Sequence, residues 1–122
     1  AEYGVDGRSN TAMMETLATA LYGQGKIKES MEFLENAILF REQNRLSEEI
    51  FYLKDLSIRA ERNIKLDLRD LIAKDYDVVA RNFPVGNIHQ STRKEVAARM
   101  ERLATYLGRK TDQARWRNAQ QN

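Results

Sequence analysis

Residue types that carry out catalysis are scarce in this sequence of 122 residues. It contains no cysteine, which excludes disulfides, thiol nucleophiles and thiolate zinc sites. Its one histidine, His89, leaves a Ser–His–Asp arrangement with a single base and excludes a metal site built from several histidines. His89 follows Ile88 in a segment that reads as a loop, so we interpret it as a surface residue.

Carboxylates are the other chemical groups that the sequence gathers. Two acidic sets recur at spacings that helices bring together: Asp67, Asp70, Asp75 and Asp77, and Glu29, Glu32 and Glu35. Diiron helical bundles need a Glu-x-x-His motif on each of two helices, which one histidine does not supply. The sequence also lacks a glycine-rich phosphate loop and a Gly-x-Ser-x-Gly nucleophile elbow. We therefore expect no enzyme activity, no cofactor and no bound metal.

The net charge of +2 hides an uneven distribution of charged residues. From Asn87 onward there are eight basic and three acidic residues, a net charge of +5, while the first 86 residues carry −3. A basic end on an acidic body is typical of contact with an acidic partner, a nucleic acid or a membrane surface, and also of an ordinary solvated helix face. The candidate basic patch consists of Arg109, Lys110, Arg115, Trp116 and Arg117.

A DNA-binding alternative rests on residues 101–120. Ala104, Gly108 and Ala114 match the small–glycine–small spacing of a helix-turn-helix, with Leu103 and Leu107 as its core. The segment from Arg115 to Asn118 resembles the end of a Myb-type recognition helix. However, the preceding helix lacks the tryptophans of that family. A basic cap followed by a tail explains the same residues.

We expect the acidic and basic residues named above to lie mostly on helices. No glycine or proline occurs between Gly25 and Pro84, whereas a multi-stranded sheet needs turns every 8–12 residues or so. Apolar residues at 3–4 spacing predict an all-α chain with five helices, at about 11–23, 27–42, 45–62, 65–83 and 92–107. The expected stripes are Met14, Leu17, Ala18 and Leu21; Ile27, Ser30, Met31, Leu34, Ala37 and Ile38; Leu46, Ile50, Leu53, Ser57 and Ala60; Leu68, Ile72, Tyr76, Val79 and Phe83; and Val96, Met100, Leu103 and Leu107.

Turn residues divide these helices. Gly23 and Gly25 end the first helix, so the first two helices form an antiparallel hairpin. Asn63 is the expected hinge between the third and fourth helices; the alternative is one unbroken helix of nearly 40 residues. Pro84 ends the fourth helix, and Thr92-Arg93-Lys94-Glu95 fits a capping box that starts the fifth. Gly108 ends the fifth.

The hairpin sequence LATALYGQGKIKESMEFLENA resembles a tetratricopeptide repeat (TPR). The positions that carry the resemblance are Leu17, Ala18, Leu21, Gly25, Ser30, Leu34 and Ala37. The continuation AILFREQNRLSEE resembles the longer repeat of kinesin light chains, so one clear repeat covers about 11–42. The usual closing proline is missing. In the second hairpin, Lys54 and Glu61 stand near the places of a small residue and the turn glycine.

The resemblance implies a TPR-like right-handed superhelix of antiparallel hairpins. Residues 1–10 are then a flexible N-terminal segment, and 11–108 a helical domain with hairpins 11–42 and 45–83 and a capping helix 92–107. Residues 109–122 form a basic tail or a short helix. Because two hairpins and a cap are few for a stable stack, a longer array or a stabilising partner is expected.

Proteins of this family bind a peptide or a helix of another protein on a concave face. Carried onto this sequence, the resemblance implies a protein–protein adaptor or regulatory domain with a partner face formed by Glu15, Thr19, Tyr22, Tyr52, Arg59 and Arg62. A second alternative is self-association through the second hairpin, including Phe51 and Ile58. Apolar runs fall short of the ~18 residues that span a bilayer. Because the sequence contains no cysteine and no signal peptide, we expect an intracellular, cytoplasmic protein, and the compartment of a longer parent protein stays open.

Overall fold

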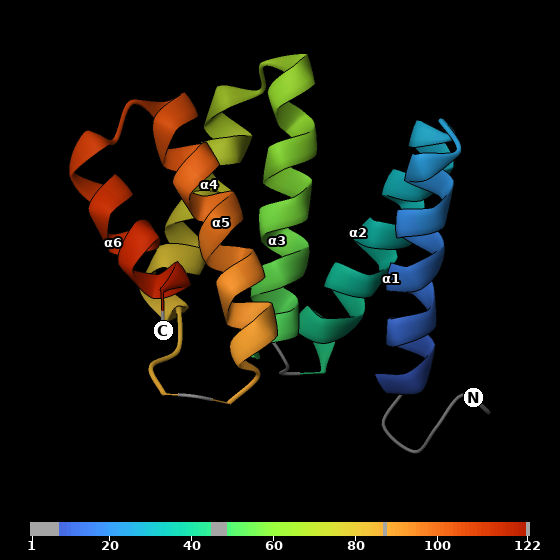
Figure 1. The fold of residues 1–122 in the computed structure, drawn as a ribbon. Coiled ribbons are helices and arrows are strands. Elements are labelled where there is room, and N and C mark those ends of the chain that lie inside the picture. The colour runs from blue at the N-terminus through green and yellow to red at the C-terminus, as the bar shows by residue number, and fades with distance from the viewer. Residues whose placement is uncertain (1–7, 45–48, 87, 122) are drawn as a thin grey trace. The chain divides into compact units, whose positions relative to one another are not determined.

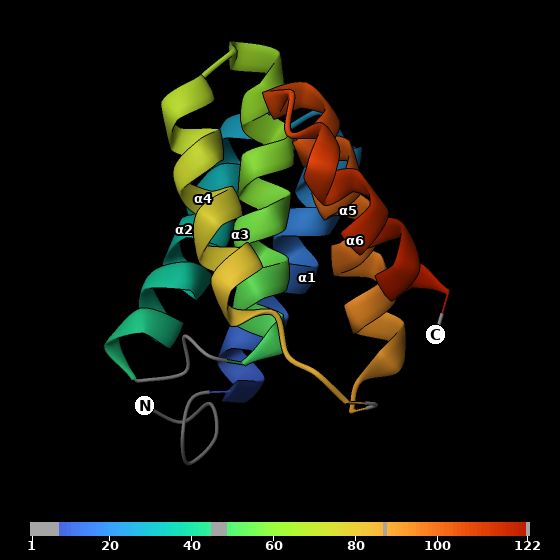
Figure 2. The same ribbon diagram turned by 90° about the vertical axis from the view of Figure 1, so that its left-hand side faces the viewer.

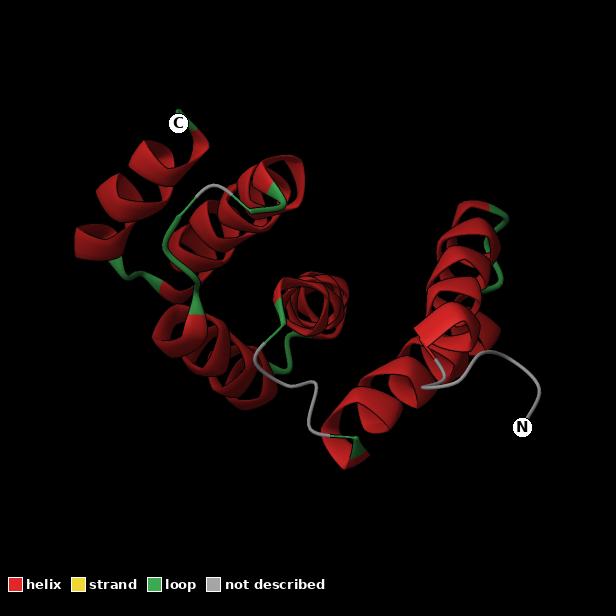
Figure 3. Ribbon diagram, turned by 90° about the horizontal axis from the view of Figure 1, so that it is seen from below, coloured by secondary structure: helices red, strands yellow, loops and turns green. Residues whose placement is uncertain are grey.

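The structure, a computed structural model, describes residues 8–44, 49–86 and 88–121 (Figure 1). All regular structure in these ranges is helical, which confirms the all-α fold class (Figure 3). The elements are α1 (Arg8–Gly23), α2 (Ile27–Gln43), α3 (Ile50–Asn63), the 3-10 helix η1 (Ile64–Leu66), α4 (Arg69–Asn82), α5 (Gln90–Leu107) and α6 (Lys110–Gln120). Residues 1–47 and 48–122 form two compact units, unit 1 and unit 2, which are described separately.

Unit 1 is a hairpin of α1 and α2, as expected from Gly23 and Gly25. Gly25 has a φ of +81°, a left-handed conformation that glycine adopts readily, and it turns the chain between the helices. Ala18 and Ser30 are both buried, and the Ser30 hydroxyl donates a hydrogen bond to the Ala18 carbonyl at 2.5 Å. The expected small residues therefore do allow these two helices to approach closely.

The apolar stripe of unit 1 is narrower than the periodicity predicts. Leu34, Ala37 and Ile38 are buried, but Leu17 and Ile27 are exposed. Two helices cover only the residues near their shared seam, whereas an apolar stripe of about 100° needs a further element to cover its flanks. Helix α1 also begins at Arg8, inside the segment expected to be flexible; the rest of that expectation lies outside the described residues.

In unit 2, α3 packs against both α4 and α5, and α5 packs against α6 (Figures 1 and 2). The stripes expected for these helices are buried almost throughout: Ile50, Leu53, Ser57 and Ala60 on α3, Ile72, Tyr76 and Val79 on α4, and Val96, Met100, Leu103 and Leu107 on α5. Leu68 is exposed, and Leu46 lies outside the described residues. Periodicity alone therefore predicted the core of α3, α4 and α5.

The break between α3 and α4 differs from the expectation. Asn63 has an ordinary helical conformation, and the chain reverses at Asp67, whose φ is +52°. The alternative of one unbroken helix is also wrong. Aspartate tolerates the left-handed conformation because its short polar side chain bonds locally. Here the Asp67 carboxylate also accepts a hydrogen bond from the Tyr106 hydroxyl on α5, which gives the reversal a tertiary anchor.

The start of α5 corrects the predicted capping box. The helix begins at Gln90, after His89 in a left-handed conformation with φ +54°, so Thr92 lies inside the first turn and is not the capping residue. Arg93 donates to the Pro84 carbonyl through Nε at 3.2 Å and Nη2 at 2.9 Å, which fixes this turn against the end of α4. The end of α5 at Gly108, with φ +74°, is as predicted.

Residues 110–120 form a sixth α-helix, so of the two alternatives predicted for residues 109–122, a tail or a short helix, the structure has the helix. Trp116 of α6 is fully buried, and its ring meets the Phe83 ring edge-on with centroids 5.2 Å apart. The indole Nε1 donates to the Tyr76 hydroxyl at 2.9 Å, and that hydroxyl donates to Asp112 Oδ2 at 2.7 Å. Helix α6 is therefore part of the core of unit 2.

We expect Trp116→Ala to lower the free energy of unfolding by about 3–5 kcal/mol, because it removes a large buried side chain and leaves a cavity. Urea denaturation followed by far-UV circular dichroism measures this loss. The matched control is Asn118→Ala at an exposed position of the same helix, for which we expect a change within about 0.5 kcal/mol. A loss below about 1 kcal/mol for Trp116→Ala would contradict the core role of this residue.

Candidate functional site

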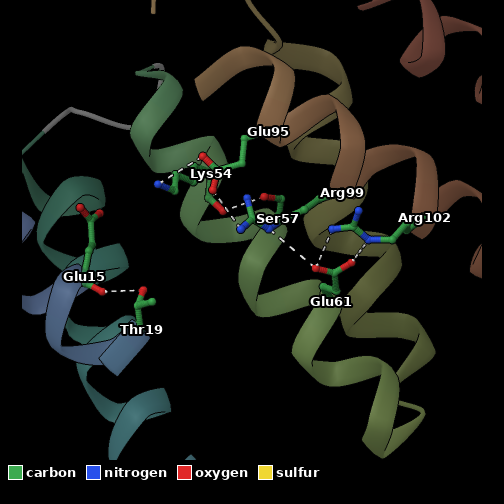
Figure 4. A network of polar contacts seen from close by, with 8 residues as sticks. All are labelled: Glu15, Thr19, Lys54, Ser57, Glu61, Glu95, Arg99 and Arg102. Carbon is green, nitrogen blue, oxygen red and sulfur yellow. Dashed lines mark hydrogen bonds and ion pairs between the residues drawn. The ribbon is translucent and has the colours of Figure 1, made fainter. Parts of the chain in front are cut away.

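Three of the predicted partner-binding residues lie on α1 in unit 1. Glu15 accepts two hydrogen bonds from the buried Arg41 guanidinium, at 3.1 and 3.2 Å, and so joins α1 to α2. Thr19 is exposed and donates to the Glu15 carbonyl at 3.1 Å (Figure 4). Tyr22 is half-buried. Thr19 is thus exposed and Tyr22 partly exposed on α1, while the Glu15 carboxylate forms an ion pair with Arg41.

The other three predicted residues lie on α3 in unit 2 and offer less surface. Tyr52 is only 6% exposed. Arg59 forms a bidentate ion pair with Asp75 of α4, at 2.9 and 2.8 Å, and Arg62 is half-buried. The reason is that α3 has neighbours on two sides, α4 and α5, so positions on both flanks are covered.

A chain of alternating charges joins α3 to α5 (Figure 4). Glu95 pairs with Lys54 at 3.6 Å and with Arg99 at 3.1 Å; Glu61 pairs with Arg99 at 3.7 Å and with Arg102. Sequence reasoning treated Lys54 and Glu61 only as departures from the repeat. Their spacing of seven residues, matched by 95, 99 and 102 on α5, was the signal of a shared face. These ion pairs link the two helices, while Arg99 Nη1 is buried without a hydrogen-bond partner among the described residues.

Four of the five residues of the predicted basic patch, Arg109, Arg115, Trp116 and Arg117, make contacts within unit 2. Arg109 pairs with Asp77, and Arg117 donates to Glu101 at 2.7 Å. Arg115 donates to the Ala80 carbonyl at 2.8 Å, and its guanidinium lies 4.3 Å from the centroid of the Trp116 ring. Lys110 is exposed. Three arginines therefore attach α6 to α4 and α5, and Trp116 belongs to the core.

The helix-turn-helix spacing is met only in part. Ala104 is buried and Gly108 makes the left-handed turn, as the pattern requires. Ala114 is exposed, however, and the position two residues later, Trp116, takes the place in the core.

An apolar pocket of about 220 Å³ lies in unit 2, where the start of α3 meets the loop between α4 and α5. We call it the loop pocket. On this loop, Val85 is 96% exposed and Ile88 78% exposed. The His89 ring meets the Phe51 ring edge-on, with centroids 4.9 Å apart. The lining residues are Glu49, Ile50, Phe51, Pro84, Val85, Ile88 and His89.

Local backbone features shape the loop pocket. Pro84 ends α4, Gly86 has a φ of +106°, and His89 adopts the left-handed conformation that starts α5. The bonds from Arg93 to the Pro84 carbonyl hold the loop at its first turn. Sequence reasoning took this segment only as a helix stop. Two large aliphatic residues within a loop that contains proline and glycine were the signal that it missed.

Burial raises the pKa of Tyr76 to about 12, from an ordinary value of 10. The hydrogen bond to Asp112 and the charge of that carboxylate raise the pKa further, while the bond from Trp116 and the charge of Arg109 act in the opposite direction. The hydroxyl therefore stays protonated well above neutral pH and keeps donating to Asp112. This role is structural, because both partners of the hydroxyl are side chains of unit 2.

The described residues meet neither the requirements of a metal site nor those of a membrane-spanning helix. Over residues 8–44, 49–86 and 88–121, no three histidine, aspartate or glutamate side chains gather as a metal ion requires. In the same ranges, no helix has both the length and the apolar character needed to cross a bilayer.

Comparison with protein-family models, curated proteins and solved structures finds no match to this chain.

The raised pKa of Tyr76 predicts a late tyrosine titration. Between pH 10 and 12 an unfolded chain releases this proton and the folded chain keeps it, so the free energy of unfolding falls as the pH rises through this range. In a stopped-flow pH jump read at 295 nm, Tyr76→Phe should match the wild type up to about pH 11 and lose amplitude only near pH 12. Loss of amplitude below pH 11 in this variant would show that Tyr76 titrates normally.

Proposed function

We propose that this chain is a protein–protein interaction module, TPR-like in its hairpins, that binds a peptide or a helix of a partner protein. The observation that carries the proposal is the loop pocket with its two exposed aliphatic residues, Val85 and Ile88. Large apolar side chains with this exposure, gathered around a concave surface, are characteristic of a binding site.

The size of the loop pocket suits one apolar anchor from the partner. Burying a side chain such as leucine contributes about 1.5–3 kcal/mol, comparable to the residues that dominate protein interfaces. Phe51 and Pro84 supply rigid apolar walls that lose little conformational entropy on binding. The lining also includes Glu49.

Unit 1 supports the same function through a different surface. The hairpin seam at Ala18 and Ser30 has the close approach that the TPR resemblance implies. Beside it, Thr19 is exposed and Tyr22 is half-buried. A tyrosine at such a position offers a large contact area with a polar tip. We propose Tyr22 as a second anchor point for the partner.

The DNA-binding alternative has weaker support. Of its key residues, Trp116 is buried, and Arg115 and Arg117 have bonds within unit 2. A recognition helix needs such side chains to project toward base edges. We therefore place the function on the loop pocket.

A random peptide library displayed on phage and selected against the full chain tests the proposal. We expect enriched peptides that share a large apolar residue, because the loop pocket has room for one apolar side chain. For a synthetic enriched peptide, the double substitution Val85→Asp and Ile88→Asp should weaken binding at least tenfold in fluorescence anisotropy, equivalent to about 1.4 kcal/mol. For enriched peptides that the double variant still binds, Tyr22→Ala should weaken binding.

Leu66→Asp is the matched control, because Leu66 is also an exposed aliphatic residue but lies on η1. We expect it to bind the peptide as the wild type does. Failure to enrich any sequence, or equal binding by the double variant and the wild type, would refute the loop pocket as the partner site.

A further inference from the structure

Helix α1 of unit 1, drawn in blue in Figure 1, carries a row of apolar side chains beside its seam with α2. Met13 is 47% exposed and Leu17 is 39% exposed. Ala20 is exposed as well, and Met14 and Leu21 are half-buried. Because successive residues turn by about 100° around a helix, these five side chains share an arc of about 120°. We call them the α1 face.

The α1 face contains no charged residue. Glu15 is the only charged residue between Arg8 and Lys26 in the sequence, and its carboxylate accepts two hydrogen bonds from Arg41 of α2. Arg8 is the first residue of α1, and Lys26 lies beyond its last turn. Exposed helix surfaces are normally rich in charged residues. A charge-free face of this length therefore indicates a contact surface.

The charged residues in the first turns of α2 lie away from the α1 face or at its edge. The buried Ser30 faces α1, because its hydroxyl bonds to the Ala18 carbonyl. Lys28 and Glu32 are each two residues from Ser30, about 200° around α2, and so lie on the side away from α1. Glu29 stands in the first turn of α2, at the turn end of the hairpin. It borders the α1 face as part of a polar rim, which interfaces commonly have.

The spacing of the α1 face suits a contact with an identical helix. Met14, Leu17 and Leu21 follow i, i+3, i+7, the spacing of the apolar seam in a coiled coil. A face that meets its own copy brings its central residues against identical residues, so a charge there would face the same charge. The α1 face has no such charge. A second copy of this chain is therefore an occupant that the face fits.

Unit 1 supplies two of the helices that a helical bundle needs. It exposes Ile27 and Leu39 of α2 in addition to Met13 and Leu17 of α1. Two helices leave apolar positions uncovered, whereas four helices enclose a core. Helix α1 has 16 residues and is about 24 Å long, so two copies joined along it bring four helices together. Association is one of the ways in which small units without disulfides gain stability, and this sequence contains no cysteine.

We propose that the α1 face binds the α1 face of a second copy of this chain, which gives a two-fold symmetric dimer. Leu17 is the midpoint between Met13 and Leu21, so it meets its counterpart whether the two α1 helices run parallel or antiparallel. In an antiparallel pair, Met13 lies near Leu21 of the second copy. Each copy contributes the same residues, so the contact is isologous and the dimer is closed.

The dimer contact stands independently of the proposed function. Thr19 is two residues from both Leu17 and Leu21, which places it about 200° from each around α1, on the opposite side of the helix from the α1 face. The loop pocket belongs to unit 2 and contributes no residue to the contact.

Sedimentation velocity and multi-angle light scattering across a concentration series test this contact on the full chain. We expect the average mass to rise from 14.2 kDa to twice that value and to stop there. The dimer should persist at about 1 M salt, where screening extends over about 3 Å, because the contact is apolar. Leu17→Asp should stay monomeric, since it places two carboxylates against each other. The matched control is Leu39→Asp, a similarly exposed leucine of α2, which should dimerise as the wild type does.

Single cysteines introduced into this cysteine-free sequence give a second test. Under mild oxidation, Leu17→Cys should form a disulfide between two copies, whereas Leu39→Cys should remain mostly uncrosslinked on a non-reducing gel. Far-UV circular dichroism checks that each variant folds; if Leu17→Asp loses helix content, the cross-linking result decides.

Three results overturn the proposal: a monomer at every concentration, a folded Leu17→Asp variant that still dimerises, or equal cross-linking at the two positions. The double substitution Val85→Asp and Ile88→Asp should dimerise as the wild type does. A monomeric double variant would place the contact between copies at the loop pocket and would also overturn the proposal.

Discussion

The buried hydrogen-bond chain from Trp116 through Tyr76 to Asp112 determines how unit 2 is assembled. It begins on α6, passes through a side chain of α4 and returns to α6. Each polar atom in it would be costly to bury alone, since an unsatisfied buried donor costs about 1–3 kcal/mol. This chain of hydrogen bonds therefore specifies one position of α6 against α4. The arginines of α6, the end of α4 and the loop that follows all depend on that position.

Arginine side chains account for much of the remaining organisation of unit 2. Arg115 and Arg93 bond to carbonyls at the end of α4, Arg59 joins α3 to α4, and Arg99 with Arg102 join α5 to α3. Arginine suits these roles because its planar group makes several fixed hydrogen bonds and stacks on aromatic rings. Most basic residues in the C-terminal part of the sequence are therefore arginines that make hydrogen bonds or ion pairs within unit 2. The apolar loop pocket is the surface that we propose for a partner.

Periodicity predicted the helices and most of their buried residues, because a helix in a core must repeat its apolar positions. It failed where a tertiary contact overrides local preference. Asp67 reverses the chain with a bond from Tyr106, 39 residues away, while Asn63 was the better local candidate. Trp116 looked isolated in a polar segment, since its apolar partners lie on other helices. The partner role of Thr19 and Tyr22 stays a prediction, with Thr19 exposed and Tyr22 half-buried. The loop pocket was not, because a loop has no periodic signal and its walls come from segments more than 30 residues apart.

The bonds that complete α4 come from residues far along the chain, at separations of 35 residues for Arg115 with Ala80 and 40 for Trp116 with Tyr76. Contacts of this kind form late, because a long intervening segment must be ordered before they add stability. During synthesis, the contacts of Arg115 and Trp116 with α4 therefore cannot form until residue 116 has left the ribosome. The α1–α2 hairpin depends on shorter separations, such as 12 residues between Ser30 and Ala18, and needs no such delay. Until α6 has formed, α4 is covered by α3 and α5 alone, which makes this stage the one most open to chaperones and to misassociation.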